Sequence, residues 1–122
     1  MPRSDLFATY SLEPAMVILF KPERILDSAF VARIGDGLKD LVSRAHEEAF
    51  VLDLSRVGYL SSAALGMLLG LARAVAERGG RLKLAGLSPE NRDLFRITRL
   101  DGVFDICEDV RTAVEALRRE KR

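Results

Sequence analysis

The chain has 122 residues, a formal net charge of +1, 48% apolar residues and 30% charged residues. A chain of this length and composition forms one domain with its own hydrophobic core, which excludes a disordered protein. Acidic and basic residues are interspersed, so no basic face is indicated and we expect no nucleic-acid partner.

Cysteine content and apolar runs bear on where the protein works. Cys107 is the single cysteine, so no disulfide forms within the chain and a reducing compartment is indicated. The N-terminal segment lacks the apolar run of a signal peptide. The apolar runs elsewhere are far shorter than the roughly 18 residues that cross a bilayer. We therefore expect a cytoplasmic protein without membrane insertion.

The first predicted elements are a hairpin and a helix. Residues 7–12 alternate loosely between apolar and polar side chains, residues 16–20 are a short apolar run, and Glu13-Pro14 between them is typical of a turn. Asp27 then has the features of a helix N-cap. The apolar residues behind it recur at three and four positions, which predicts an amphipathic helix of about five turns.

The centre of the chain predicts a buried strand, a loop and a second helix. Residues 49–54 are nearly all apolar, as expected for a strand covered on both faces. Residues 55–60 form a loop, and residues 61–62 open a helix that runs from Ala63 to about Arg78. The first turns of this helix are apolar almost all round, so the sheet, neighbouring elements or a partner must cover them.

The last third predicts two strands and two helices. Residues 81–87 alternate as a strand, Ser88-Pro89 starts a third helix, residues 103–106 form a short strand, and a final helix begins near Val110. The apolar face of the third helix is expected to consist of Leu94, Phe95, Ile97 and Leu100.

This alternation of strands and helices predicts an α/β fold. We expect a single domain over residues 1–122, with a mostly parallel sheet of about five strands, an N-terminal hairpin and about four helices.

Few residues are suited to catalysis or metal binding. His46, the only histidine, and Cys107 lie far apart in the sequence, and they are interpreted as a surface histidine and a small apolar residue in or beside an edge strand. Gly66 and Gly70 lie inside a predicted helix, where their spacing is typical of close helix packing and not of a phosphate-binding loop. We expect no catalytic residue, no metal site and no cofactor.

One segment has a pattern that indicates function. Ser61 and Ser62 lie where a short, partly apolar loop ends and a helix begins, and one of them is expected to cap that helix. The loop contributes Val57, Tyr59 and Leu60, and the helix exposes apolar residues early. This combination predicts a contact surface around a hydroxyl group.

The same segment resembles the STAS domain and, within it, the bacterial anti-sigma-factor antagonists. The family pattern is an apolar strand, Asp-Leu-Ser, and then a small-residue run such as Asp-Ser-Ser-Gly-Leu-Gly. Here the pattern stands as Asp-Leu-Ser at 53–55 and Leu-Ser-Ser-Ala-Ala-Leu-Gly at 60–66. Residues 78–84, 95–100 and 103–106 also fit the family, so the resemblance covers nearly the whole chain as a STAS-like single domain.

The resemblance implies a regulatory binding protein, not an enzyme. In this family a serine or threonine at the helix start is phosphorylated by an anti-sigma factor serine kinase of the GHKL type. The unphosphorylated form binds that kinase, which releases a sigma factor, and a PP2C-type phosphatase restores it. The ATP belongs to the kinase, so the resemblance implies no cofactor for this chain.

The resemblance also assigns site residues. When the final Leu-Gly is aligned, Ser62 falls on the first serine of the motif and Ser61 on the aspartate, while Ala63 stands at the commonly phosphorylated second serine. We therefore expect phosphorylation at Ser62, with Ser61 as the second choice. The expected partner-binding residues are Asp27, Ser55, Gly58, Tyr59, Leu60, Ser61, Ser62, Ala63, Ala64 and Leu65.

Two other functions stay open. A STAS scaffold or adaptor subunit of a signalling or lipid-transport complex, without phosphorylation, is favoured by Ala63 and by the apolar helix start. An enzyme with Ser62 as nucleophile would need His46 as its base, and it is the least favoured. Assembly into a homo-oligomer is also left open.

Overall fold

The computed structural model describes residues 5–120. The described elements are β1 (Phe7–Leu12), β2 (Ala15–Phe20), β3 (Arg24–Ile25), α1 (Ser28–Arg44), β4 (Ala49–Asp53), β5 (Tyr59–Leu60), α2 (Ser62–Glu77), β6 (Arg81–Ala85), α3 (Pro89–Ile97), the 3-10 helix η2 (Leu100–Gly102), β7 (Asp105–Cys107) and α4 (Val110–Glu120).

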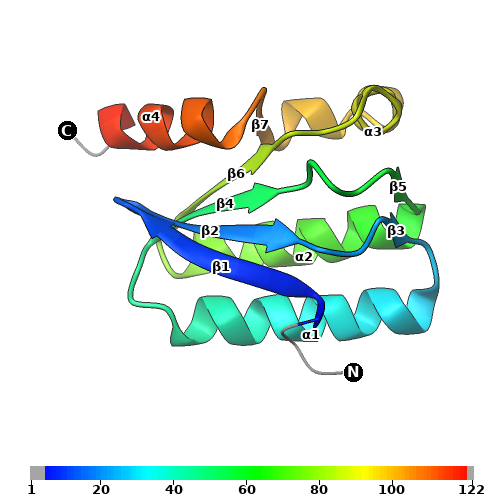
Figure 1. Ribbon diagram of the computed structural model, residues 1–122, viewed down its shortest axis with the longest axis horizontal. Helices are drawn as coiled ribbons and strands as arrows, with labels where there is room; N and C mark the ends of the chain where they lie inside the picture. The colour runs from blue at the N-terminus through cyan, green and yellow to red at the C-terminus, as the bar shows by residue number, and fades with distance from the viewer. Residues whose placement is uncertain (1–4, 121–122) are drawn as a thin grey trace.

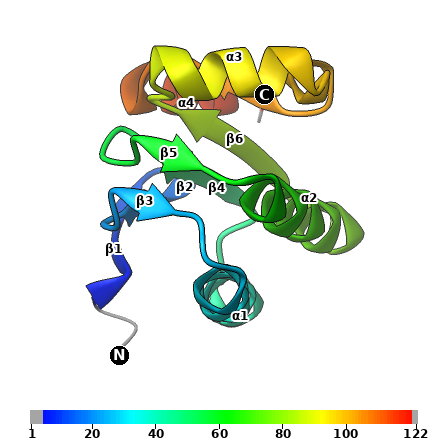
Figure 2. The ribbon, with the colours of Figure 1, turned by 90° about the vertical axis from the view of Figure 1, so that its right-hand side faces the viewer.

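The main sheet has five strands in the order β1-β2-β4-β6-β7. β1 is antiparallel to β2, and every other neighbouring pair is parallel. Helices α1 and α2 pack side by side on one face of the sheet, and α4 covers the other face (Figures 1 and 2). α3 packs against η2 and β5, and its Phe95 joins the same core cluster as α1 and α2. The predicted α/β fold, with its N-terminal hairpin and four helices, is confirmed for the part of the chain that the structure describes.

The hydrophobic core has two layers because side chains alternate along each strand. Along β4, Phe50 and Leu52 belong to the larger cluster, and Val51 belongs to the smaller one. The helical residues that bury fully against the larger cluster include Ile34, Leu38, Leu68 and Leu71, and those of the smaller cluster are Ala113, Val114 and Leu117. β4 is therefore covered on both faces, as its nearly continuous apolar run predicts.

The expected loop over residues 55–60 is wrong in part, because its end is a strand. β5 pairs in parallel with β3, with Arg24 opposite Tyr59 and Ile25 opposite Leu60. Each strand has two residues, which is too short for any period to appear in the sequence. Only the approach of two segments that are distant in the chain creates this ribbon.

The expected apolar face of the third helix is also wrong at Ile97, whose side chain is 73% exposed. The helix ends there because Arg99 adopts a left-handed conformation with φ of 62°. The Leu94 carbonyl oxygen accepts from both the Thr98 hydroxyl at 2.7 Å and the Thr98 amide at 3.0 Å, which closes this helix end. Leu100 then belongs to η2 and not to α3.

The expected close packing at Gly66 and Gly70 is not observed. A Cβ atom added at either position would have no neighbour within 4 Å. The tight contact lies on α1 instead, where a Cβ at Gly35 would lie 3.0 Å from Cγ of Met67. Gly66 and Gly70 therefore leave open space beside α2, and no other described helix packs closely against them.

A buried lysine ties α4 to the sheet. The Lys83 side chain is 5% exposed, and its Nζ donates to Asp105 Oδ2 at 2.8 Å and lies 2.7 Å from Glu120 Oε2. Burial alone would lower the pKa of Lys83, but the hydrogen bonds and charges of Asp105 and Glu120 outweigh burial and raise it. These contacts connect β6, β7 and the end of α4.

The Lys83→Met variant tests the energetic contribution of this ammonium group. At neutral pH we expect the free energy of unfolding to fall by about 1–2 kcal/mol, since a hydrogen-bonded charge is lost while the aliphatic stem stays packed. Because the folded-state pKa is raised, the contribution is fully present below the ordinary lysine pKa and is lost as pH rises through the folded value.

Urea unfolding of both proteins at about pH 7, 9 and 11 measures this difference. The gap between wild type and Lys83→Met should narrow between about pH 9 and pH 11. Lys39→Met, at an exposed position of α1, serves as the control and should leave stability unchanged. A gap that stays constant at alkaline pH would contradict the role assigned to the ammonium group.

Candidate functional site

The candidate site begins where β4 ends. Asp53 Oδ1 accepts a hydrogen bond from the Ser55 amide at 3.0 Å, which turns the chain away from the sheet. The Leu54 amide donates to the Ala85 carbonyl at 2.9 Å, so the turn is anchored to β6. The following loop therefore leaves the carboxyl end of the parallel sheet, where binding sites of α/β folds commonly lie.

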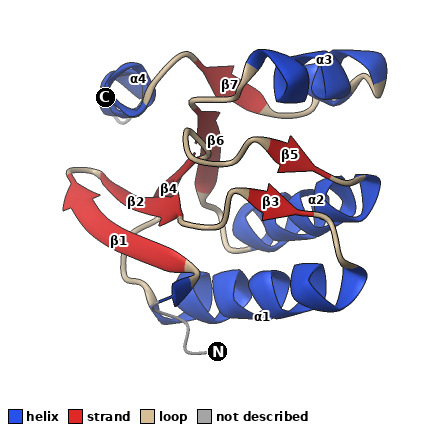
Figure 3. Ribbon diagram, turned by 45° about the vertical axis from the view of Figure 1, so that its right-hand side comes forward, coloured by secondary structure: helices blue, strands red, loops and turns tan. Residues whose placement is uncertain are grey.

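Backbone hydrogen bonds then hold the loop on the segment before α1. The amides of Gly58 and Tyr59 donate to the Glu23 carbonyl at 2.8 and 3.3 Å, and the Ser61 amide donates to the Ile25 carbonyl at 3.0 Å. In Figure 3, β3 and β5 lie next to each other ahead of the α2 start. This ribbon sets the position from which α2 begins.

A buried asparagine, which the sequence analysis missed, supports the loop from α3. Asn91 is 2% exposed, and its Nδ2 donates to the Val57 carbonyl oxygen at 3.0 Å. Asn91 and Phe95 are four residues apart on α3 and both are buried. An asparagine on the apolar side of a predicted helix is the signal that could have revealed it, because a buried amide needs partners.

The two adjacent serines have different structural roles. Ser61 is the N-cap of α2 with φ of −86° and ψ of 168°, and its Oγ accepts from the Ala64 amide at 3.2 Å. Ser62 is the first residue of α2 and its side chain is exposed. Within residues 5–120 no hydrogen bond of the Ser62 hydroxyl is observed, so this group is accessible to another molecule.

Exposed residues gather around Ser62. Tyr59 is 52% exposed, and the Arg24 guanidinium lies 5.1 Å from the centre of its ring. Leu26, directly after β3, is also exposed, as is Ala63 on α2. We call Arg24, Leu26, Tyr59, Ser62 and Ala63 the α2-start surface. Arg24 and Leu26 were missed by the sequence analysis, because only the β3–β5 pairing brings them here.

A hollow of about 310 Å³ continues from this surface between α1 and α2. Its lining includes Val31, Gly35, Ala63, Gly66, Met67 and Gly70. The glycines that fail to pack against another helix therefore form part of a shallow groove beside Ser62.

The structure separates the expected partner-binding residues into exposed and buried groups. The exposed ones are Asp27, Ser55, Tyr59, Ser62 and Ala63, and the half-buried ones are Gly58 and Ser61. Leu60, Ala64 and Leu65 are buried, so they lie beneath the surface and do not present side chains to a partner. Asp27 caps α1, since its Oδ1 accepts from the Ala29 amide at 2.9 Å.

The structure does not bring the histidine and the cysteine together. His46, with a 94% exposed side chain, precedes the start of β4, while Cys107 lies opposite Ala85 at the far end of the sheet. Among residues 5–120 no group of three or more His, Cys, Asp or Glu side chains is arranged to hold a metal ion. Within the same residues, no helix combines the length and apolar character needed to cross a membrane.

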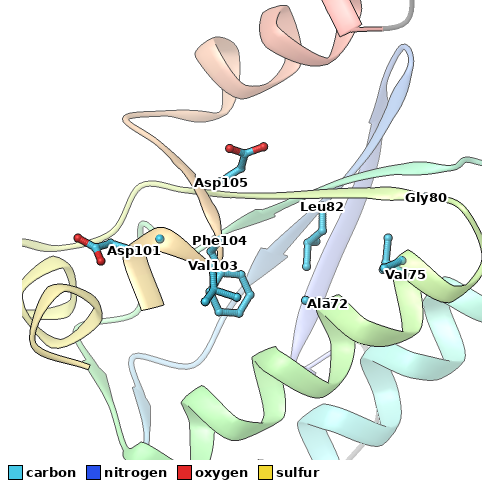
Figure 4. Close-up of a pocket in the computed structure, with 10 residues that line it drawn as sticks. Ala72, Val75, Gly80, Leu82, Asp101, Val103, Phe104 and Asp105 are labelled. Atoms are coloured by element: carbon cyan, nitrogen blue, oxygen red, sulfur yellow. The ribbon is translucent and has the colours of Figure 1, made fainter. Parts of the chain in front are cut away.

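A larger hollow, of about 400 Å³, lies away from the serines between α2, β6 and the segment around η2 (Figure 4). Two carboxylates, Asp101 and Asp105, line it beside the apolar Leu82 and Phe104. Asp105 is already paired with Lys83 at 2.8 Å.

Comparison with known proteins identifies the class. The family model described as "Mlab, STAS domain" matches residues 25–111. The chain therefore belongs to the STAS domain family.

Individual relatives lie among the anti-sigma-factor antagonists. BtrV of Bordetella bronchiseptica, whose name assigns it to that group, is 33% identical over 72 residues, which are 59% of this chain and 62% of BtrV. The chain thus matches less than two thirds of that relative's length. An anti-sigma factor antagonist from Mycobacterium paratuberculosis has a similar fold, with a TM-score of 0.79, 21% identity and 92% of each chain covered.

A second solved structure is the Bacillus cell fate determinant SpoIIAA in its phosphorylated form. It has a TM-score of 0.63 and 20% identity, and the superposition covers 91% of this chain and 98% of that one. At this level of identity the similarity shows a shared fold.

The two serines make a matched pair for a stability test. Ser61→Ala removes the acceptor for the Ala64 amide, so we expect the free energy of unfolding to fall by about 1 kcal/mol. Ser62→Ala removes only an exposed hydroxyl, so we expect a change within about 0.5 kcal/mol. Chemical denaturation monitored by circular dichroism measures both values. Equal losses in the two variants would show that the cap is shared and would contradict the division of roles.

Proposed function

We propose that this chain is a regulatory binding protein of the anti-sigma-factor-antagonist type, which binds its partner through the α2-start surface and is released by phosphorylation of Ser62. The observation that carries the proposal is the exposed Ser62 residue at the start of α2, beside a second serine already engaged as the helix cap. The fold similarity to a protein solved in a phosphorylated form supports it.

The local electrostatics favour a phosphate at Ser62 in the free protein. The amides of the first helical turn lack intrahelical acceptors, and α2 has no acidic residue in that turn. A phosphoserine carries about −1.5 to −2 charges at neutral pH, and a helix N-terminus stabilises such charge by roughly 0.3–1 kcal/mol. We therefore expect phosphorylation to leave the fold intact.

The same charge opposes binding. Leu26, Tyr59 and Ala63 are exposed apolar residues on the segments next to Ser62, and a partner bound there would exclude water from them. A doubly charged group in a desolvated contact costs several kcal/mol unless the partner supplies compensating cations. Phosphorylation of Ser62 thus destabilises the complex with the partner and leaves the fold of the free protein unchanged.

The partner that fits is an anti-sigma factor serine kinase of the GHKL type, which brings its own ATP, in the cytoplasm. The Ser62 Oγ attacks the γ-phosphorus, the bond to the bridging oxygen of ADP breaks, and the hydroxyl proton passes to a base of the kinase. A PP2C-type phosphatase reverses the change: water attacks the phosphorus, inorganic phosphate leaves, and Ser62 recovers its proton.

A second function, a constitutive STAS scaffold or adaptor, is favoured by a different observation. Ala63 carries no hydroxyl at the position where the family motif has its second serine, and the groove between α1 and α2 continues the surface past Ser62. A partner that occupies this groove permanently would need no switch. The two functions differ in whether charge at Ser62 changes binding.

A capture experiment with three variants separates them. Wild type, Ser62→Ala and Ser62→Asp are immobilised, exposed to native cytosol and compared for recovered partners, and the intact mass of each recovered chain is measured. We expect wild type and Ser62→Ala to retain the same kinase, and Ser62→Asp to bind it about tenfold more weakly or worse, which corresponds to about 1.4 kcal/mol.

Thr112→Asp is the matched control for that experiment. Thr112 is exposed in the first turn of α4, where its amide donates to Asp109 Oδ1 at 2.8 Å, so Thr112→Asp adds a carboxylate at another helix start, away from Ser62. This variant should bind like wild type. If all four proteins hold the same partners and no phosphate maps to Ser62, the switch is refuted and the scaffold is supported.

A further inference from the structure

The two edges of the main sheet differ in their protection. β7 at one edge has three residues, and its Asp105 is ion-paired with Lys83. β1 at the other edge has six residues, Phe-Ala-Thr-Tyr-Ser-Leu, with no charge and no proline. Edge strands usually carry charges, prolines or bulges that prevent pairing with another chain. β1 lacks these devices, and Figures 1 and 3 show it at the margin of the sheet.

The register with β2 identifies the backbone groups that point outward. Phe7 lies opposite Phe20, and the Lys21 amide donates to the Leu6 carbonyl at 2.9 Å. In an antiparallel pair, hydrogen-bonded residues alternate with residues whose amide and carbonyl point away. Since Leu6 belongs to the bonded set, Thr9 and Ser11 present their amides and carbonyls to the open side.

Apolar side chains line the same edge. Tyr10 lies opposite Val17 and Leu12 opposite Ala15, on the face of the sheet that α4 covers over β2, β4, β6 and β7. Tyr10 is 44% exposed and Leu12 is 38% exposed. The open edge and an uncovered apolar strip therefore adjoin each other.

We propose that β1 is a homodimerisation strand, which pairs antiparallel with β1 of a second copy about a two-fold axis at Tyr10. Thr9 then exchanges backbone hydrogen bonds with the partner's Ser11. Tyr10 faces the partner's Tyr10, and Ala8 faces the partner's Leu12. The two main sheets join into one continuous sheet across the dimer.

The charges and the side-chain sizes along β1 favour pairing with β1 of a second copy in this register. A strand without charges opposes no like charges when it pairs with itself, whereas a shift that centres the axis on Thr9 would place Asp5 opposite the partner's Glu13. Small Ala8 opposite Leu12 and an aromatic pair at the axis suit cross-strand packing. Burial first, and then the charge of Asp53, raise the pKa of Tyr10, so its phenol stays neutral.

The expected dimer is weak and leaves the α2-start surface free. One short strand pair with its apolar strip buries less than the roughly 800 Å² per partner of a standard interface, so we expect a dissociation constant in the micromolar range. None of the five residues of the α2-start surface takes part in the pairing.

Sedimentation velocity of the full chain between about 1 and 300 µM tests the proposal. We expect wild type to shift from monomer to dimer with concentration. Tyr10→Lys should raise the dissociation constant at least tenfold, because two ammonium groups would meet at the axis. Thr9→Pro should weaken the dimer as well, since it removes an outward amide that β2 does not use. Ile97→Lys is the control, since it introduces the same charge at an exposed apolar residue of α3, and it should dimerise like wild type.

A charge-pairing experiment tests the register itself. Tyr10→Lys and Tyr10→Glu should each be monomeric alone at about 100 µM, and an equimolar mixture should recover a dimer. Far-UV circular dichroism and thermal unfolding verify that both variants fold. A wild type that stays monomeric throughout would overturn the proposal. So would a dimer that Tyr10→Lys leaves unchanged, or a mixture that stays monomeric.

Discussion

The α2-start surface depends on the hydrogen bonds that the loop before α2 makes to the segment before α1. The amides of Gly58 and Ser61 reach the carbonyls of Glu23 and Ile25 at 2.8 and 3.0 Å, and the resulting β3–β5 ribbon fixes where α2 begins. Two backbone segments held by several bonds move together. The first turn of α2 is therefore presented from a supported position although a loop leads into it.

At the start of α2, the two neighbouring serines have different structural roles. The Ser61 hydroxyl satisfies the Ala64 amide, so its removal affects the helix itself. The Ser62 hydroxyl projects from the first helical residue, where free amides tolerate negative charge. In the proposed function, stability and regulation are therefore assigned to two adjacent residues, so a modification of Ser62 would change binding and spare the structure.

The proposed dimer contact and the proposed partner contact lie on different parts of the fold. β7 is short and carries the charged Asp105, while β1 is longer, uncharged and open. The proposed dimer contact lies on β1, and the proposed partner contact lies on α2 and the ribbon. The two contacts share no residue, so a dimer would display two switch sites without closing either of them.

The sequence by itself determined the elements with a strong local pattern and the class to which the chain belongs. Buried β4, the Asp27 and Ser88 caps, the helical periodicity of α1 and the presence of α2 and α4 were all predicted, because each depends on residues close together in the chain. Only the tertiary structure decided the β3–β5 ribbon, the place of Asn91 beneath the loop, and the exposure of Ser62 beside the buried Ala64 and Leu65. These depend on segments that meet only when the chain is folded, and no local pattern records which segments those are.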